Sequence, residues 1–254
     1  MAETPAYVIL GRGRWAQKMR PIIAGEGRTV ATIEETRQRS SESQHNYVAR
    51  LAEGMKSSRA EIAWLCVSPG WHVSLMIQAA LEAGLHVIAE KPWYGSAADT
   101  ERLQTLARAK RRLIGVHFEY LVHADVEKWK STFCPVSGLG FGGHFFLSRA
   151  DHLGLPAMDN LGCHLFAIRE FAVPGSETCE IICDYERPDQ RIVWIEEGGK
   201  RVASIDLLRG SERIIQGFMK KVEAALDGAA FPFDLDFALR VANQLNVFKE
   251  RSTG

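Results

Sequence analysis

Lys91 is the side chain whose place in the sequence best suits proton-transfer chemistry. It follows a short, mainly apolar run, His86–Ala89, and lies between Glu90 and Pro92. A lysine at the carboxyl end of a strand in an open α/β sheet lies where such sheets bind ligands. An amine that is desolvated beside a bound ligand loses its proton more readily than an amine in water. We therefore interpret Lys91 as a proton-transfer group at a ligand site, in a segment that Pro92 keeps non-helical.

A G-x-G-x-x-A sequence near the start predicts a dinucleotide-binding turn. The apolar run Tyr7–Leu10 leads directly into this turn, which covers residues 11–16. The first glycine permits the tight bend, the second lets the backbone approach a pyrophosphate, and the small last residue keeps the next helix close to the sheet. That helix presents its amino end to the phosphates. We assign four residues of the turn to cofactor binding: Gly11, Gly13, Arg14 and Trp15.

Glu34 is expected to decide which dinucleotide binds. It follows the second apolar run, Thr29–Ile33, and such an acid about twenty residues beyond the glycines can hydrogen-bond a ribose 2′-hydroxyl. This favours NAD. Arg37, Arg39 and Ser40 lie just beyond and are suited to a 2′-phosphate, so NADP stays an alternative.

Three further residues complete the predicted cofactor site. Ser68 and His72 belong to the turn that leads from the apolar run Ile62–Val67 into a helix. Both residues are expected to line the path of the dinucleotide. Glu90 is expected to orient Lys91 or its loop.

Strands and helices alternate over residues 7–118. We expect strands over 7–10, 29–33, 62–67, 86–89 and 113–116, and helices after Gly13 and over 44–53, 72–83 and 96–108. Pro21 is expected to bend or shorten the first helix, and Gly54 to end the second. Ser96 and Asp99 resemble a capping box that opens the last of these helices. Continuous apolar runs are typical of strands covered on both faces. The alternation predicts an α/β fold with a doubly wound parallel sheet of the Rossmann type.

The second half of the chain predicts a smaller α+β domain with a mainly antiparallel sheet. Strands are expected over 140–149, 178–186, 190–196 and 201–208, and helices over 161–171, 211–226 and 234–250. The expected division is an NAD(P)-binding Rossmann domain of residues 1–118 and a substrate or oligomerisation domain of residues 119–254.

The composition limits the class of protein. The 254 residues suit one large or two small domains. Lysine plus arginine equals aspartate plus glutamate, at 31 each, so no basic excess favours nucleic acid or a membrane surface as partner. We expect no signal peptide and no membrane span. Five cysteines without a CxxC pair indicate reduced thiols, and we expect a cytoplasmic protein.

Several motifs occur here in the order typical of one known family. They are the Gly11 turn with Trp15, Ser68-Pro69-x-x-His72, the stretch 80–87 that runs into Glu90-Lys91-Pro92, Leu161–His164, and the closing residues 251–254. With these motifs the sequence resembles the glucose–fructose oxidoreductase / inositol dehydrogenase (Gfo/Idh/MocA) family over almost its whole length. The resemblance implies an NAD(P)-dependent oxidoreductase. Such an enzyme transfers hydride between nicotinamide and a small polar substrate, such as a sugar, a sugar derivative or a polyol.

The resemblance also implies catalytic roles. Lys91 would transfer the proton of a substrate hydroxyl or carbonyl, His164 would assist near the same oxygen, and Asn160 would position the substrate. Family members usually carry aspartates where this chain has Asn160 and Ala167. An amide can still hydrogen-bond a hydroxyl but cannot accept a proton as a carboxylate does. The second domain is also shorter than is usual in the family.

Other interpretations stay open beside this one. The same family includes a galactose-regulon repressor that binds dinucleotide without turnover, so a non-catalytic regulator is the main alternative, and an imine reductase is a third. Without its context, Lys91 would be read as a solvated surface group, and His164 as a core histidine.

Metal and partner predictions complete the sequence-based assignment. No metal is predicted, because one group of acids and histidines matches no known ligand spacing: His144, Asp151, His152, Asp159 and His164. The expected partners are a small-molecule substrate and further copies of the chain, as a dimer or tetramer.

Overall fold

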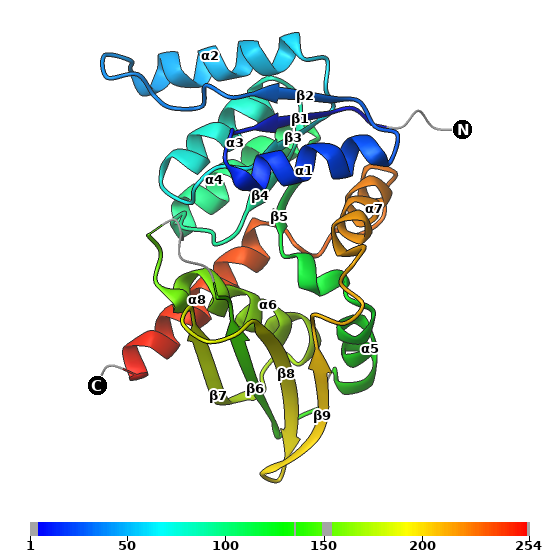
Figure 1. Cartoon of the computed structure of the whole chain (residues 1–254). Helices are drawn as coiled ribbons and strands as arrows, with labels where there is room; N and C mark the ends of the chain where they lie inside the picture. The colour runs from blue at the N-terminus through cyan, green and yellow to red at the C-terminus, as the bar shows by residue number, and fades with distance from the viewer. Residues whose placement is uncertain (1–4, 135, 149–153, 253–254) are drawn as a thin grey trace. The chain divides into compact units, whose positions relative to one another are not determined.

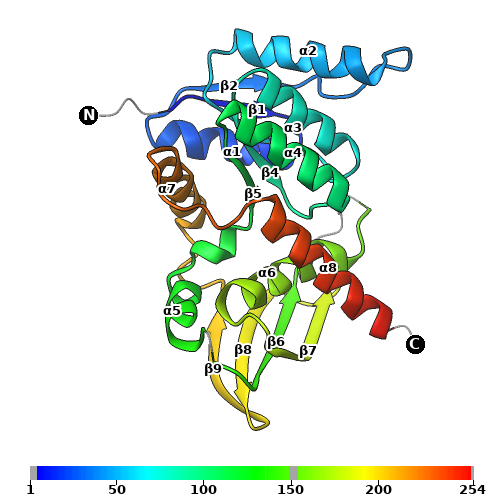
Figure 2. The same cartoon turned by 180° about the vertical axis from the view of Figure 1, so that it is seen from behind.

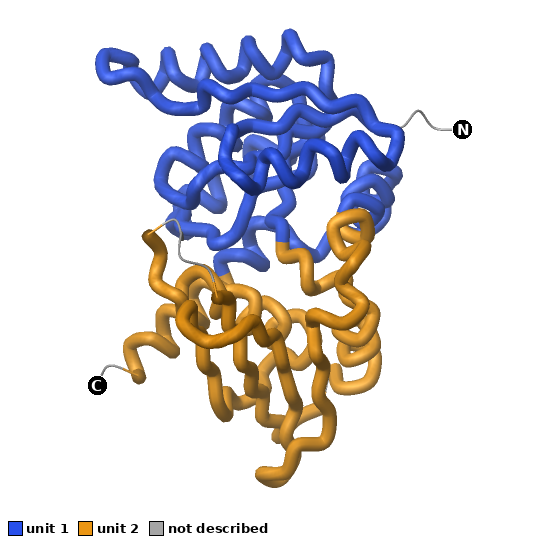
Figure 3. The backbone as a smooth tube through the Cα atoms, in the orientation of Figure 1, with its two compact units in different colours: residues 1–117, 219–239 blue, residues 118–218, 240–254 orange. Residues whose placement is uncertain are grey.

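The computed structural model describes residues 5–134, 136–148 and 154–252, in two compact units (Figures 1 and 3). Unit 1 comprises residues 1–117 and 219–239, and unit 2 comprises residues 118–218 and 240–254. The chain therefore leaves unit 1, forms most of unit 2 and returns. The expected division into residues 1–118 and 119–254 does not include the return of residues 219–239 to unit 1.

Unit 1 is built on a five-stranded parallel sheet with the order β2-β1-β3-β4-β5. Its strands are β1 (Tyr7–Leu10), β2 (Val30–Ile33), β3 (Ile62–Leu65), β4 (His86–Glu90) and β5 (Ile114–His117). Strands β1, β3 and β5 are buried along their whole length, which explains their continuous apolar sequences. The predicted Rossmann-type sheet is confirmed.

Helices cover both faces of this sheet. Helix α1 (Arg14–Gly25) lies on one face, and α2 (Gln44–Ser57), α3 (His72–Glu82) and α4 (Ala97–Lys110) lie on the other (Figures 1 and 2). The predicted capping box opens α4, because the Ser96 side chain accepts from the Asp99 backbone and the Asp99 carboxylate accepts from the Ser96 backbone.

Two helices continue past the residues that were expected to limit them. Helix α1 runs through Pro21 to Gly25, and α2 runs through Gly54 to Ser57. Pro21 and Gly54 are both exposed, so neither interrupts the buried face of its helix. A glycine in a helix costs only about 0.5–1 kcal/mol relative to alanine. Burial of the apolar residues around Gly54 outweighs that cost.

The returning segment of unit 1 is attached to the sheet at two places. Helix α7 (Ile214–Leu226) carries Glu223, which accepts hydrogen bonds from Arg28 at 2.5 and 2.6 Å and from the Tyr7 hydroxyl at 3.0 Å. The backbone N–H of Val116 on β5 donates to the carbonyl of Phe233 at 2.7 Å. These contacts explain why residues 219–239 belong to unit 1.

Unit 2 contains a four-stranded mixed sheet with the order β7-β6-β8-β9. Its strands are β6 (Leu139–Phe146), β7 (Glu177–Asp184), β8 (Gln190–Glu197) and β9 (Lys200–Asp206). The pairs β6–β8 and β8–β9 are antiparallel, and β6–β7 is parallel. The predicted strands and the mainly antiparallel pairing are therefore confirmed.

Helical segments cover one face of the second sheet (Figure 2). They are the 3₁₀ turn η1 (Glu119–Val122), α5 (Ala124–Phe133), the π turn η2 (Met158–Gly162), α6 (Cys163–Ala172) and α8 (Leu235–Ser252). Helix α5 was not expected from the sequence. Within the described ranges, no helix is long and apolar enough to cross a membrane.

Candidate functional site

The glycine turn of unit 1 has the geometry that a dinucleotide needs. Gly11 has φ +122°, and a Cβ atom there would lie 2.3 Å from the carbonyl oxygen of Cys66. Gly13 is the N-cap of α1, and a Cβ atom there would meet nothing within 4 Å. Arg14 begins the helix. The turn thus combines a bend that requires glycine with an open backbone at a helix amino end, which suits a pyrophosphate.

The loop that carries Glu34 is held by Arg50 of α2. The Arg50 guanidinium donates to the Glu42 carboxylate at 2.8 Å and to the backbone carbonyls of Glu35 and Arg37 at 3.2 and 2.9 Å. The hydrogen bond from Arg50 lowers the pKa of Glu42 to about 2. Glu34 itself is exposed directly after β2. The fixed loop therefore presents an acid to solvent at the carboxyl end of a strand.

The basic residues of the same loop are arranged differently. Arg39 pairs with Glu35 at 3.0 Å, and both side chains are largely exposed. Ser40 is also exposed. Because Arg39 already has an acidic partner, its charge is less suited to a 2′-phosphate than the sequence suggested.

His72 begins helix α3 and is half-buried. Burial lowers its pKa, and a backbone hydrogen bond with Ser68 partly opposes that effect. The imidazole is therefore neutral near pH 7. Gly70 makes room for the ring, since a Cβ atom there would lie 3.0 Å from it. Ser68 and His72 are thus in direct contact, as residues lining one turn should be.

Glu90, at the end of β4, accepts hydrogen bonds from three aromatic N–H groups. The donors are Trp15 Nε1 at 2.6 Å, Trp64 Nε1 at 2.9 Å and His117 Nδ1 at 3.1 Å. Its side chain is only 12% exposed, and that of His117 is fully buried. Two residues that the sequence predicted for the cofactor site, Glu90 and Trp15, are therefore hydrogen-bonded to each other. Trp64 and His117 were missed, because nothing in the apolar runs of β3 and β5 marks them as polar partners.

The surroundings of Glu90 keep its carboxylate ionised. Burial, the largest single effect, acts to raise its pKa. The charge of His117 and the hydrogen bonds from His117, Trp64 and Trp15 together outweigh burial, so the pKa is lowered. A buried carboxylate with three N–H donors is a fixed negative charge next to Lys91.

Hydrogen-bonded side chains lie on both sides of Lys91. Glu90 precedes it, with the three hydrogen bonds described above. Trp93 is buried and its Nε1 donates to the Thr100 hydroxyl at 3.0 Å. Lys91 is half-buried at the carboxyl end of β4. A proton-transfer group needs this kind of fixed position.

His164 of unit 2 is the second residue of α6 and is buried. Its ring lies edge-on to Tyr120, with centroids 5.1 Å apart, and stacks on Phe145 at 5.3 Å. Its Nε2 atom lies 3.7 Å from Glu119 Oε1. A histidine that only packs in the core would explain the contacts with Tyr120 and Phe145. It would not explain the carboxylate of Glu119 beside the ring.

Asn160 lies in the π turn η2, which leads into α6. Its Nδ2 donates to the Tyr185 hydroxyl at 3.0 Å. The neighbouring Asp159 accepts from Lys249 at 2.6 Å. Asn160 and His164 therefore belong to one unit, whereas Lys91 belongs to the other.

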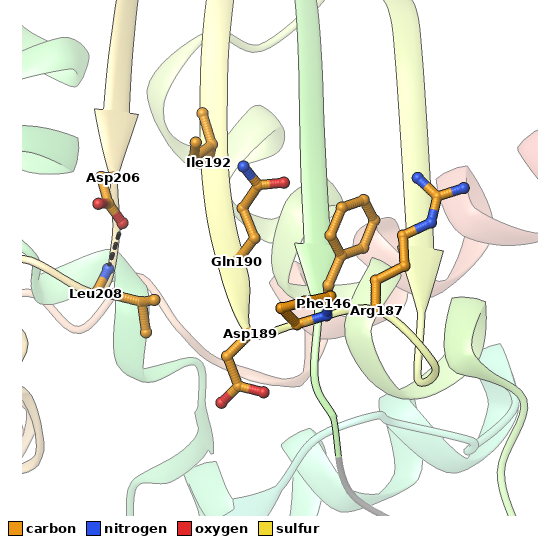
Figure 4. Close-up of a pocket in the computed structure, with 8 residues that line it drawn as sticks. Phe146, Arg187, Asp189, Gln190, Ile192, Asp206 and Leu208 are labelled. Carbon is orange, nitrogen blue, oxygen red and sulfur yellow. Dashed lines mark hydrogen bonds between the residues drawn. The ribbon is translucent and has the colours of Figure 1, made fainter.

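Unit 2 also has a pocket that the sequence did not predict. An open pocket of about 420 Å³ is lined by Phe146, Arg187, Pro188, Asp189, Gln190, Ile192, Asp206 and Leu208 (Figure 4), none of which the sequence singled out. No group of acids, histidines and cysteines within the described part of the chain could hold a metal ion. Asp151 and His152 lie outside the described residues.

Residues 6–118 match the family model GFO_IDH_MocA, whose description is "Oxidoreductase family, NAD-binding Rossmann fold". The predicted resemblance is therefore found over residues 6–118, and NAD is the cofactor that the description of this fold names.

Two curated proteins match parts of the chain. The uncharacterized oxidoreductase YfiI of Bacillus subtilis (strain 168) is 34% identical over 76 residues, which cover 30% of this chain and 19% of that protein. The dTDP-3,4-didehydro-2,6-dideoxy-alpha-D-glucose 3-reductase of Saccharopolyspora spinosa is 41% identical over 63 residues, which cover 25% and 19%. The matched part thus spans about a fifth of the length of these curated relatives.

A solved structure is similar over more of the chain. The UDP-N-acetylglucosamine 3-dehydrogenase GnnA from Acidithiobacillus ferrooxidans has a TM-score of 0.78 at 12% identity, with 95% of each chain covered. At this identity the similarity concerns the fold.

Exchanging Glu90 for glutamine tests the buried charge. Because the pKa of Glu90 is lowered in the folded chain, its ionised form stabilises the fold above the ordinary pKa of 4.5, and this contribution is lost as pH falls through the folded-state pKa. Between about pH 6 and about pH 3, the wild type should therefore lose more free energy of unfolding than Glu90→Gln. Urea unfolding measures this. The exposed Glu101→Gln is the control, and equal pH dependence in Glu90→Gln and the wild type would contradict the assignment.

The two glycines of the turn should respond differently to alanine. Gly13→Ala adds a methyl group to open space, so stability is kept while affinity for NADH falls by about tenfold or more. Gly11→Ala meets both a carbonyl and a positive φ and should lose about 2 kcal/mol or more of stability. Calorimetric titration with NADH and thermal unfolding separate the two effects. Undiminished NADH binding by Gly13→Ala would show that the pyrophosphate lies elsewhere.

Proposed function

We propose that the chain is an NAD-dependent oxidoreductase that transfers hydride between nicotinamide and a hydroxyl or carbonyl carbon of a small polar substrate. Gly11, Gly13, Arg14 and Trp15 hold the dinucleotide, Glu34 binds its ribose, and Ser68, His72 and Glu90 line its path. When bound, NAD supplies the hydride acceptor or donor. Arg37 and Arg39 keep NADP as an alternative cofactor.

The observation that carries this proposal is the position of Lys91. The residue lies at the carboxyl end of β4 in an NAD-binding sheet, between a locked carboxylate and a buried tryptophan. Alcohol oxidation needs a group that takes the hydroxyl proton as hydride leaves, and carbonyl reduction needs the reverse. Lys91 performs this transfer, His164 assists, and Asn160 positions the substrate.

A sugar, a sugar derivative or a polyol is the proposed substrate. Support comes from the two similar proteins with named sugar-nucleotide substrates, the reductase of Saccharopolyspora spinosa and the dehydrogenase GnnA. The hydrogen-bonding groups of Asn160 and His164 suit a substrate with several hydroxyls.

A non-catalytic dinucleotide-binding regulator is the second candidate. It is favoured by the buried, aliphatic Ala167 and by the amide of Asn160, which stand where the resemblance implies aspartates. Such a protein would bind NADH, turn over no substrate and capture a protein partner.

Lys91→Ala tests the proposed chemistry. With an accepted substrate from a panel of sugars, nucleotide sugars and polyols, turnover should fall by about 10²-fold or more, because general acid–base catalysis contributes that much. NADH absorbance at a single wavelength measures turnover, and calorimetry should show unchanged NADH affinity. Lys110→Ala, at the exposed end of α4, is the control. Full turnover by Lys91→Ala would refute the role of Lys91, and NADH binding without turnover of any panel member would favour the regulator.

We also propose that the chain forms a homo-oligomer in the cytoplasm. The free thiols among the described cysteines suit a reducing compartment such as the cytoplasm.

The oligomer is proposed to form through the sheet of unit 2. Val202, on the edge strand β9, is 50% exposed, and the nearby Leu208 is 37% exposed. Light scattering should give the mass of a dimer or tetramer. Val202→Glu should lower that mass toward the monomer, whereas Val247→Glu, on α8, should not. A monomeric wild type would contradict the proposal.

A further inference from the structure

Glu119 places a carboxylate beside His164. It is the first residue of η1, and its Oε1 atom lies 3.7 Å from His164 Nε2. The side chain is 15% exposed. Its second oxygen, Oε2, is buried and makes no hydrogen bond within the described part of the chain. A buried carboxylate with an unsatisfied oxygen is costly, so its retention beside a histidine calls for a compensating charge.

Three other described residues around His164 bring no negative charge to it: Tyr120, Phe145 and Arg191. Tyr120 and Phe145 present rings to the imidazole. Arg191, from β8, donates to the Tyr120 hydroxyl at 2.7 Å, and its guanidinium lies over both rings, at 5.8 and 5.4 Å from their centroids. Its positive charge opposes protonation of His164.

Asp159 is the carboxylate nearest in sequence to the position where the resemblance implies an aspartate. It is already paired with Lys249 at 2.6 Å, and its side chain is 14% exposed. Its charge is therefore neutralised by a lysine of α8. Asn160, the next residue, has no carboxylate at all.

We propose that Glu119 is the positioning residue that supplies the carboxylate partner of His164. The negative charge holds the imidazole in place and stabilises its protonated form, so that His164 can accept a proton released near the substrate oxygen and return it in the reverse direction. The hydride and the substrate proton leave separately, and Glu119 itself changes no bond. The catalytic use of this pair rests on the proposed oxidoreductase function, but the pair itself does not.

The test is the titration of His164 in the full-length chain, followed by NMR of its imidazole with the resonance assigned by its loss in His164→Asn. Glu119→Gln keeps the size of the side chain and removes its charge. The midpoint of the His164 titration should fall by about one pH unit, because an opposite charge within about 4–6 Å shifts titration by one to three units. Glu119→Asp, which keeps the charge, should stay closer to the wild type.

Asp159→Asn is the matched control, since it removes a carboxylate of the same unit that is paired with Lys249 rather than with His164. It should leave the midpoint of His164 unchanged. An unchanged midpoint in Glu119→Gln, or a larger fall in Asp159→Asn, would overturn the proposal. The titration needs no substrate, so its result is independent of whether the Lys91→Ala experiment supports the oxidoreductase.

In an active enzyme, Glu119→Gln should also move the acidic limb of the pH profile of kcat to lower pH, a shift that a purely structural role would not produce.

Discussion

The buried carboxylate of Glu90 is the interaction on which the rest of unit 1 depends. Its three donors come from different elements, Trp15 from α1, Trp64 from β3 and His117 from β5. One side chain at the end of β4 therefore ties the cofactor-binding helix and two neighbouring strands together. Lys91 is the next residue, so the same hydrogen bonds that organise the sheet edge also fix the backbone of the proposed proton-transfer group. This places the candidate chemistry on a rigid scaffold.

Local chemistry explains which parts of unit 1 the sequence could predict. The glycine turn, the capping box at Ser96 and the continuous apolar runs each reflect constraints within a few residues, and each appears in the structure. Pro21 and Gly54 show where prediction from local sequence preferences fails. Their local preferences oppose a helix, but packing of the buried faces of α1 and α2 outweighs them. Helix α5 was missed because it begins at a histidine cap, His123, rather than at one of the usual capping residues.

The parts of the candidate site that could not be predicted depend on contacts between distant residues. His117 and Trp64 are 27 and 26 residues from Glu90, and both lie in apolar strands where no polar role is apparent. Glu119 lies in a turn that carries no motif, and its relation to His164 arises only because η1 packs on α6. The pairing of Asp159 with Lys249 likewise joins residues that are 90 positions apart in the sequence. Sequence spacing contains no information on any of these pairs.

We infer that the ammonium group of Lys91 faces a nicotinamide ring held by the glycine turn. A crystal structure of the chain with NAD bound tests this most directly. We expect the pyrophosphate on the backbone at Gly11 and Gly13, a ribose hydroxyl on the carboxylate of Glu34, and the Lys91 side chain directed at the reactive face of the nicotinamide. A nicotinamide bound away from the end of β4, with Lys91 directed into bulk solvent, would contradict it.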